Sequence, residues 1–349
     1  MFTKQKIKKL IIILSFMIIF TLSLVFYDVL NSKIINLFAN RFNIVSNDGN
    51  LLVHFIDVDQ ADAAAINLPD GKVMLIDTGS KEVNTTYINY LKENVVHSKR
   101  NSYIDYLVLS HSDMDHIGGT MKLLKNFQIG TIYMPKLPSN SNGYAEILNY
   151  LESHQDYKTL GNEFEIKSKD YKFTFFESLN DTNTNDSSQV IRFECGEKSF
   201  LFVGDISSSV EQKYVEIYGK ELDVDVLKVS HHGSKTATSS EFLEYVTPDY
   251  AVISVGYNEY GHPTEEVLNR LNDVNAKVLR TDKQANILFV DGKNYDLKQI
   301  DGIYFITSLS LDYSYYVFII DIGFVVYAII VIIKKEKKKN KHITKELLV

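Results

Sequence analysis

Apolar and polar positions follow two kinds of pattern through the middle of the chain. Short apolar runs bounded by Gly, Pro, Asn and Asp predict strands, and apolar residues three and four apart predict helices. The predicted strands are Leu51–Val58, Ala61–Leu68, Val73–Asp77, Tyr106–Ser110, Thr131–Met134, Lys172–Phe176, Gln189–Cys195, Ser199–Val203, Asp225–Val229, Ala251–Val255 and two more near Val278 and Ile287. The predicted helices are Val83–His97, a segment ending at Phe127, Tyr144–Glu152, Ser207–Tyr218, one near Glu241, and Pro263–Leu271. Periodicity alone therefore predicts an α/β or α+β fold.

Two apolar segments near the ends of the chain approach the thickness of a bilayer. Residues 10–28 follow a basic tail at residues 1–9, and residues 313–333 precede a lysine-rich tail at residues 334–349. Because lysines favour the cytoplasmic side, we expect both tails in the cytoplasm and the intervening chain outside it. A cleavable signal peptide is the alternative for the first segment, but no small-residue cleavage motif follows it. We therefore predict a transmembrane helix at each end.

The predicted external part consists of a connector at residues 29–49 and a domain at residues 50–300. Residues 29–312 contain 26 basic and 40 acidic residues, a net formal charge of −14. This charge disfavours DNA binding through a broad basic face, so metals and local lysines would have to hold a nucleic acid. The single cysteine, Cys195, excludes an intramolecular disulfide, and we expect it to pack in the core.

The densest chemistry lies in a ten-residue segment, Ser110–Gly119. Two imidazoles and two carboxylates fall within six residues, between a predicted strand and a predicted helix; they are His111, Asp113, Asp115 and His116. Ligands at the end of a strand sit on a rigid rim, and a mixed imidazole and carboxylate set suits a hydrolytic centre with two metal ions. The alternative is a polar turn with solvated charges.

This segment resembles the His-x-His-x-Asp-His motif of the metallo-β-lactamase superfamily, with Asp113 in place of the second histidine. That replacement resembles the subgroup of the bacterial competence protein ComEC. Further segments that resemble the subgroup, in the same order, are Phe55–Ala63, Leu75–Gly79, Asn185–Val190, Phe202–Asp205, Leu227–Ser234, Tyr260–Pro263 and Arg280–Asp282. The resemblance covers about residues 51–290, and nothing in the chain matches the channel domain of ComEC.

The resemblance implies an α+β fold of the metallo-β-lactamase type, an αββα sandwich, here flanked by the two predicted transmembrane helices. Three residues depart from the subgroup by replacing glycines. They are Asp59 and Ala61, whose loop we expect to be reshaped, and Ala285.

The resemblance also implies a set of metal ligands. His111 and Asp113 would hold one divalent ion, Asp115 and His116 the second, and Asp205 would bridge both. One residue of the pair His231 and His232 would complete the shell of the second ion and the other would support it, and the sequence does not decide between them. The usual third histidine for the first ion is absent, and the segment Asn185–Ser188 takes its place.

Other residues are expected around these ligands. The resemblance implies that Asp77 supports the site from behind the ligands, the alternative being a cap at a strand end. Asn185 and Ser188 are expected at the rim of the site rather than in a flexible surface turn. Asp282 is expected either behind the ligands or near the substrate, and His262 is either a substrate-side proton donor or a structural turn residue.

Two divalent ions, zinc or manganese, about 3.5–4 Å apart would activate the water between them for attack on an electrophile. In this reading Asp115 and His262 take part in catalysis. The leading hypothesis is a hydrolase anchored in the bacterial cell membrane with its domain outside the cytoplasm, acting on DNA as a phosphodiesterase or nuclease. The alternatives are a hydrolase of a small or cell-surface substrate, such as a phosphoester, lactone or β-lactam, and a non-catalytic scaffold that binds a membrane partner through its anchors and Asp321. The complete ligand set disfavours the scaffold.

Overall fold

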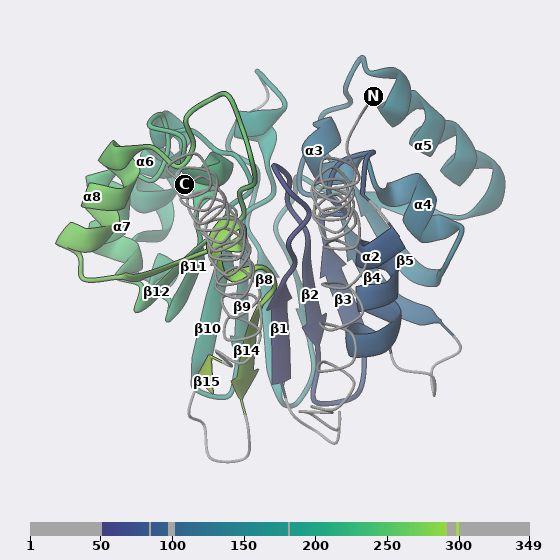
Figure 1. Ribbon diagram of the computed structural model, residues 1–349, viewed down its shortest axis with the longest axis horizontal. Coiled ribbons are helices and arrows are strands. Elements are labelled where there is room, and N and C mark those ends of the chain that lie inside the picture. The colour runs from purple at the N-terminus through teal and green to yellow at the C-terminus, as the bar shows by residue number, and fades with distance from the viewer. Residues whose placement is uncertain (1–50, 84, 97–101, 181, 292–297, 300–349) are drawn as a thin grey trace, which may run out of the picture. The chain divides into compact units, whose positions relative to one another are not determined.

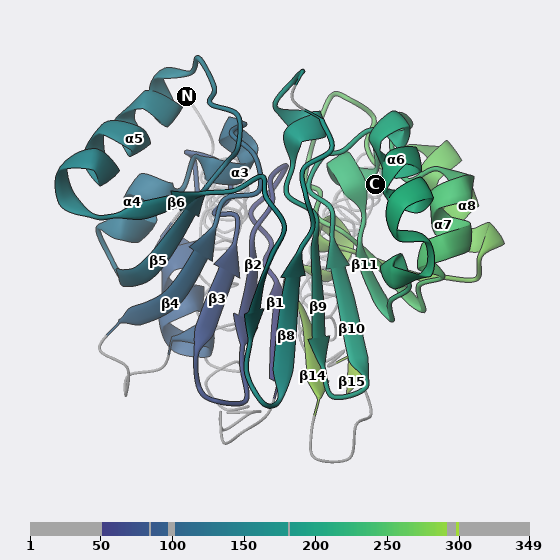
Figure 2. The same ribbon diagram turned by 180° about the vertical axis from the view of Figure 1, so that it is seen from behind.

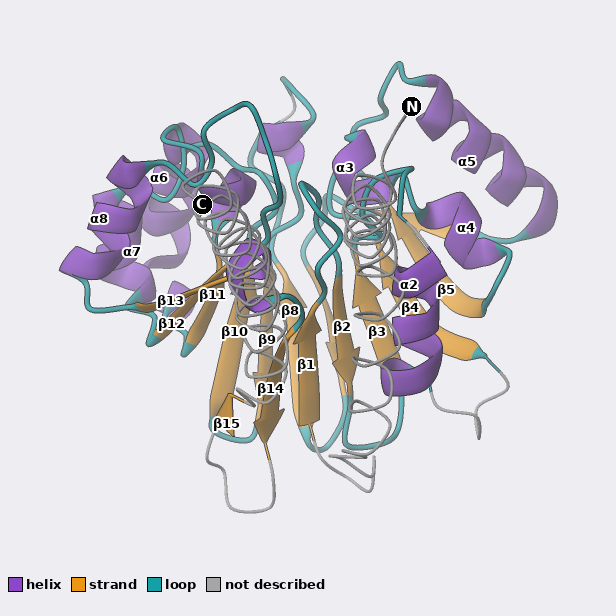
Figure 3. Ribbon diagram, viewed as in Figure 1, coloured by secondary structure: helices purple, strands orange, loops and turns teal. Residues whose placement is uncertain are grey.

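A computed structural model of the protein describes residues 51–83, 85–96, 102–180, 182–291 and 298–299. In this part of the chain two β-sheets pack face to face, and helices cover both outer faces (Figures 1 and 3). The predicted tails, the connector and both predicted transmembrane segments lie outside the described residues. Within them, no helix combines the length and the apolar character needed to span a bilayer.

The first sheet has eight strands within the described residues, in the order β15-β14-β1-β2-β3-β4-β5-β6. Its strands are β1 (Leu51–Phe55), β2 (Ala64–Asn67), β3 (Val73–Ile76), β4 (Tyr103–Val108), β5 (Gln128–Met134), β6 (Tyr157–Thr159), β14 (Ile287–Asp291) and β15 (Lys298–Gln299). Pairing is antiparallel from β15 to β3 and parallel from β3 to β6.

The second sheet has seven strands in the described part of the chain, in the order β13-β12-β11-β10-β9-β8-β7. Its strands are β7 (Phe164–Lys167), β8 (Tyr171–Phe175), β9 (Ile191–Cys195), β10 (Lys198–Phe202), β11 (Val226–Lys228), β12 (Tyr250–Ile253) and β13 (Lys277–Arg280). Pairing is parallel from β10 to β13 and antiparallel from β7 to β10. Each sheet therefore carries one parallel region, whose strands end at a common edge.

Helices cover the two sheets from opposite sides (Figures 1 and 2). The first sheet is covered by α2 (Thr85–Tyr90), the π-helical turn η1 (Leu91–Val95), α4 (Thr120–Leu124) and α5 (Asn142–His154). The second is covered by α6 (Ser208–Tyr218), α7 (Ser240–Val246) and α8 (Glu265–Asp273). Shorter turns are α3 (Met114–Ile117), α9 (Thr281–Gln284) and the 3₁₀ turns η3 (Asn185–Ser187), η4 (Gly219–Leu222) and η5 (Ser230–Gly233). The resulting sandwich with outer helices is the fold that the resemblance implied.

The core between the sheets is rich in aromatic rings. Phe173 and Phe193 stack with ring centroids 4.3 Å apart, and Phe55 and Phe202 join the two sheets with centroids 5.7 Å apart. In β8 and β9 buried and half-buried residues alternate, as expected for strands with one face on the core. Cys195, at the end of β9, is buried, which confirms its predicted place in the core.

The structure corrects several predicted elements. The helix predicted over Val83–His97 is instead α2 followed by a π-helical turn, in which the Val96 amide donates to the Leu91 carbonyl. The strands β6, β7 and β15 were not predicted. In β7 the charged residues Glu165 and Lys167 alternate with half-buried apolar ones, so the short edge strand lacks a strong apolar run.

Candidate metal centre

Polar side chains gather where parallel strands of both sheets end. Asp77 follows β3, His111 follows β4, Asp205 follows β10, and the turn Ser230–Gly233 follows β11. In sheets of this kind the carboxyl ends of parallel strands form the edge at which ligands bind. The order of the strands therefore brings segments separated by more than a hundred residues to one place.

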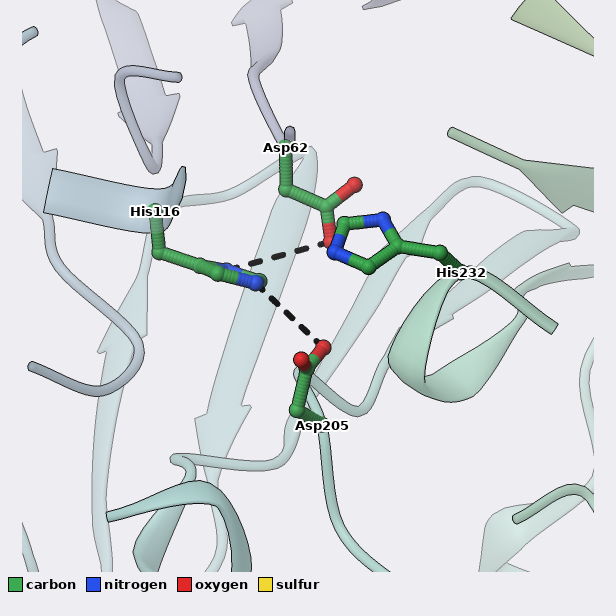
Figure 4. Close-up of side chains that lie close together, drawn as sticks. All are labelled: Asp62, His116, Asp205 and His232. Carbon is green, nitrogen blue, oxygen red and sulfur yellow. Dashed lines mark ion pairs between the residues drawn. The ribbon is translucent and has the colours of Figure 1, made fainter. Parts of the chain in front are cut away.

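Four side chains at this edge form a compact and fully buried group. They are Asp62, His116, Asp205 and His232, and one ligand atom from each lies within 4.8 Å of the others. Figure 4 shows the two imidazoles and two carboxylates pointing toward a common centre. Three of the four were expected as ligands, whereas Asp62, on the loop between β1 and β2, was not.

The two oxygens of Asp205 face different partners. Oδ1 lies 3.3 Å from Nε2 of His116. Oδ2 lies 4.0 Å from Nε2 of His111 and 3.7 Å from Nε2 of His231. The carboxylate thus stands between two groups of imidazoles, which is the arrangement that a ligand shared by two ions requires.

A half-exposed carboxylate accompanies each group. Oδ2 of Asp115 lies 3.2 Å from Nε2 of His232, and Oδ2 of Asp113 lies 4.0 Å from Nε2 of His111. Their side chains are 37% and 38% exposed, whereas those of the two histidines are buried. The site is therefore closed on the protein side and open where these two carboxylates meet solvent.

The two adjacent histidines of η5 separate into different groups. Both have left-handed backbone conformations, with φ of 50° at His231 and 53° at His232, a rare state for residues other than glycine. Nδ1 of the buried His232 lies 2.8 Å from the Ser254 carbonyl, which can only accept, so Nε2 is left to face Asp115. His231 is 31% exposed and faces Asp205 on the side of His111. The strained turn thus directs the His231 ring toward Asp205 and the His232 ring into the buried group with Asp62 and His116.

Asp77 lies behind the candidate ligands and supports His116. Its Oδ1 accepts from the Ser110 amide at 2.7 Å, and its Oδ2 lies 2.8 Å from Nδ1 of His116. The Ser110 hydroxyl donates to the same Oδ2. A carboxylate in this place holds the proton on Nδ1 and leaves Nε2 of His116 free to ligate.

The segment Asn185–Ser188 positions Asp205. The Ser188 hydroxyl accepts from the Asp205 amide at 3.0 Å and donates to the Asn185 carbonyl at 2.6 Å. A Cβ atom on Gly204, which has φ of 55°, would lie 2.6 Å from the Cβ of Ser188. Glycine is therefore required before Asp205, because both the backbone conformation and the close approach exclude a side chain.

Two further predicted site residues, His262 and Asp282, have different surroundings. The His262 ring stands 5.8 Å from the His231 ring, and its Nδ1 is buried with no hydrogen-bond partner. Asp282 is held by Arg280, with N–O distances of 2.9 and 2.6 Å. The structure thus places His262 beside His231 at the candidate metal centre and engages Asp282 in an ion pair.

Buried atoms without partners fit the group to a metal. Nε2 of His111, Nε2 of His116, Oδ1 of Asp205 and Oδ1 of Asp62 are buried without a hydrogen-bond partner. Leaving such atoms unsatisfied costs free energy, so a clustered set of them indicates a missing partner. Imidazole nitrogen and carboxylate oxygen together suit zinc, iron and manganese.

The charge states of these residues also suit metal binding. Burial lowers the pKa of His111 to about 4, so its imidazole is neutral near neutral pH. Burial opposes ionisation of Asp205, but the neighbouring imidazoles, that of His116 first, hold the pKa of its carboxyl well below the usual range. Burial likewise disfavours a proton on His116, yet Asp205 and Asp77 raise its pKa well above the ordinary value. The metal-free cluster therefore keeps a proton where a cation would bind.

Two residues at the candidate site, Asp62 and Lys228, were not predicted from the sequence. Oδ2 of Asp62 accepts from Nζ of Lys228 at 2.8 Å, and Lys228 also donates to the Val229 carbonyl. Both side chains lie within segments that resemble the ComEC subgroup, and a carboxylate between Ala61 and Ala63 was an available signal. The corresponding signal for Lys228 was a lysine in an otherwise apolar strand.

Comparison with known families and proteins also indicates a metallo-β-lactamase fold. The family described as the metallo-beta-lactamase superfamily matches residues 56–257. ComE operon protein 3 of Bacillus subtilis (strain 168) is 31% identical over 257 residues, which are 68% of this chain and 32% of that protein. Competence protein ComA of Neisseria gonorrhoeae is 36% identical over 191 residues, which are 54% of this chain and 26% of that protein. The aligned part is thus about a third of these relatives' length or less.

Among solved structures, the metallo-beta-lactamase fold protein YhfI from Bacillus subtilis superposes with a TM-score of 0.48 and 12% identity, over 69% of this chain and 99% of that one.

Proposed function

Since this chain belongs to the metallo-β-lactamase superfamily, we propose that it is a metal-dependent phosphodiesterase that cleaves DNA. The match to this superfamily supports a metal-dependent hydrolase, and two relatives are ComE operon protein 3 and competence protein ComA. The identification of DNA as the substrate goes beyond the family assignment. It is supported by the geometry around Asp205 and by the resemblance to proteins named for competence.

The position of Asp205 between two groups of donors carries the proposal. One group of donors lies on the Oδ2 side of Asp205 and consists of His111, Asp113 and His231. The other group lies on the Oδ1 side and consists of Asp115, His116 and His232, with Asp62 beside them. These two sets would hold two divalent ions with Asp205 shared. Such ions would lower the pKa of a water molecule and offset the charge that develops on a phosphodiester in the transition state.

The protein's own groups prepare the ligands. Asp77 holds the proton on Nδ1 of His116, and the Ser254 carbonyl does the same for His232, so both rings present Nε2 to the centre. Ser188 fixes the backbone of Asp205. These contacts set the direction of each donor before a substrate arrives, which is the form of preorganisation that favours hydrolysis.

His262 is the group we assign to the leaving oxygen. Its ring lies beside His231 at the edge of the cluster, and its buried Nδ1 has no hydrogen-bond partner. A histidine in this place could hold a proton for an alkoxide that departs from phosphorus. The role is separable from metal binding, because a His262→Gln variant should keep its metal content.

The test is cleavage of DNA by the purified full-length chain. Single- and double-stranded oligonucleotides are incubated with added manganese or zinc, beside an Asp205→Asn variant whose metal content is measured in parallel. We expect cleavage that depends on metal and is lost in the variant. Intact DNA with metal bound by the wild-type protein would refute the nuclease proposal.

A second candidate is a hydrolase of a small or cell-surface substrate, such as a phosphoester, lactone or β-lactam. The net charge of −14 over residues 29–312 favours it, because an acidic domain repels a polyanion. A panel of such compounds, assayed with the same two proteins, separates the candidates by which substrate is turned over.

We also propose that the apolar segments at residues 10–28 and 313–333 anchor the chain in the membrane, with the domain outside the cytoplasm. Their length and the flanking lysines support this arrangement. Protease added to intact cells should degrade the domain and leave the lysine-rich tails protected. Degradation only after lysis would contradict the orientation.

A further inference from the structure

Two tyrosine side chains near the metal centre are far more exposed than other large apolar side chains. Tyr257 is 91% exposed and Tyr260 is 77% exposed, and within the described residues the next is Ile217 at 60%. Both tyrosines lie on the short loop from Gly256 to His262, which we call the tyrosine loop. Two large solvent-exposed aromatic rings within four residues of each other indicate a surface whose burial by a planar ligand would be favourable.

The tyrosine loop is joined to the metal centre by a row of rings. The Tyr260 ring stacks on His262 with centroids 5.7 Å apart and an interplanar angle of 30°. The His262 ring lies 5.8 Å from that of His231. Nε2 of His231 is in turn 3.7 Å from Asp205. A ligand resting on Tyr260 would therefore be a few ångströms from the group that we assign to the leaving oxygen.

The loop is held in one shape by Asn258. Its Nδ2 donates to the carbonyls of Gly256 and His262, at 3.0 and 2.9 Å, and its Oδ1 accepts from the His262 amide at 3.0 Å. The Gly256 amide also donates to the side chain of Gln60, on the loop that follows β1. The two exposed rings thus stand on a braced loop, so less conformational freedom is lost when a ligand is bound.

The composition of the loop indicates which part of a nucleic acid it would contact. Between Gly256 and His262 there is a glutamate, Glu259, and no lysine or arginine. Such a loop cannot attract phosphates, whereas the face of a tyrosine binds any base by stacking, largely independently of charge. Bases inside a duplex are already stacked on one another and are not available to it.

We propose that Tyr257 and Tyr260 form a stacking platform for unpaired bases of a single-stranded nucleic acid whose phosphodiester enters the metal centre. The inference rests on the proposed function and names the part of the substrate that the protein recognises. It also accounts for how an acidic domain would hold a polyanion, because affinity comes from the bases and not from a basic face. The tyrosines bind and position the strand and take no part in the chemical step.

The test measures binding separately from cleavage. All variants are made in the full-length Asp205→Asn chain, so that the strand stays intact, and binding of a fluorescent single-stranded oligonucleotide is followed by anisotropy. The substitutions are Tyr257→Ala with Tyr260→Ala, and Tyr257→Phe with Tyr260→Phe. The matched control is Tyr103→Ala, because Tyr103 is a partly exposed tyrosine at the opposite end of β4 from His111.

We expect the double alanine variant to raise Kd about tenfold or more, on the basis of typical stacking contributions. The double phenylalanine variant, which keeps both rings, should bind as tightly as the parent, and so should the Tyr103 control. An abasic oligonucleotide of the same length keeps the phosphates but lacks the bases, so it should bind the parent as weakly as the normal strand binds the alanine variant.

Kd values within twofold of the parent for both the alanine variant and the abasic strand would overturn the platform. The proposed function is judged by a different result, cleavage by the wild-type chain. Cleavage with Kd unaffected by the alanine substitutions refutes the platform alone, whereas absence of any DNA cleavage refutes the nuclease proposal. Tighter binding of duplex than of single strand would also overturn the inference.

Discussion

The ammonium group of Lys228 lies 2.8 Å from the carboxylate of Asp62, and each side chain is only 6% exposed. Lys228 ends β11 in the second sheet, and Asp62 follows β1 in the first. The Asp62 amide also donates to the Asp115 carbonyl at 3.1 Å. One buried ion pair thus links the two sheets at the candidate metal centre, to which Asp62 itself belongs.

Breaking this pair should destabilise the protein strongly. Lys228→Met removes the ammonium group that forms the short, buried pair with the Asp62 carboxylate, and we expect a loss of about 3–5 kcal/mol in the free energy of unfolding. Adding Asp62→Asn removes the carboxylate charge and should recover part of the loss. Urea unfolding of the metal-free protein measures both effects.

A surface pair of equal length provides the control. Lys72 lies 2.8 Å from Asp70, but its side chain is 41% exposed, so Lys72→Met should cost less than about 1 kcal/mol. Equal losses for Lys228→Met and Lys72→Met would show that burial does not decide the strength of these pairs.

Single substitutions should remove the two ions selectively. His232→Ala is expected to weaken the ion on the side of His116, and His111→Ala the ion on the other side, because His232 belongs to the buried group of His116, which faces Oδ1 of Asp205, whereas His111 faces Oδ2. Asp205→Asn should weaken both. Native mass spectrometry gives the number of bound ions, and the same residual metal content in all three variants would contradict a shared carboxylate.

Metal affinity should rise with pH. Although burial disfavours a charged imidazole, Asp205 and Asp77 raise the pKa of His116 well above the ordinary value, so the metal-free site carries a proton that a cation must displace. Lowering the pH strengthens the competing proton and weakens metal binding. Calorimetry in buffers of different ionisation enthalpy should detect proton release. Release should be smaller in Asp77→Asn, and no release in the wild-type protein would contradict the prediction.

Ala285→Gly should stabilise the fold. Ala285 ends α9 with φ of 54° and ψ of −136°, a region almost confined to glycine, and strain of this kind costs about 1–3 kcal/mol. Relief of the strain should exceed the greater flexibility of glycine in the unfolded chain, giving a gain of about 1 kcal/mol.

The same substitution at an ordinary helical position should have the opposite sign. Ala145 is exposed within α5, so Ala145→Gly should cost about 1 kcal/mol. Thermal unfolding of both variants compares them, and a fall in Tm for Ala285→Gly would show that the strain is offset by contacts of the methyl group.

The local pattern of apolar and polar residues was sufficient to predict much of the secondary structure of this protein. The alternation of apolar runs with turn residues predicted most of the strands, because their period and boundaries are set by neighbours in the chain. The segment His111–His116 was recognisable as a candidate site because its imidazoles and carboxylates are concentrated at a predicted strand end, whereas Asp205 was expected as a ligand only from the resemblance to the superfamily. The resemblance also marked Asp59 and Ala285 as replacements of glycines, and the structure shows both residues with positive φ.

Only the tertiary structure decided how these pieces meet. Strands of both sheets end at one edge, and this arrangement brings Asp62 into the buried group and pairs it with Lys228. The same arrangement separates His231 from His232. The exposure of Tyr257 and Tyr260 beside that edge is equally a property of the folded chain. A one-dimensional pattern records which residues are polar or aromatic, whereas burial and distance between residues a hundred positions apart are fixed by the packing of the two sheets.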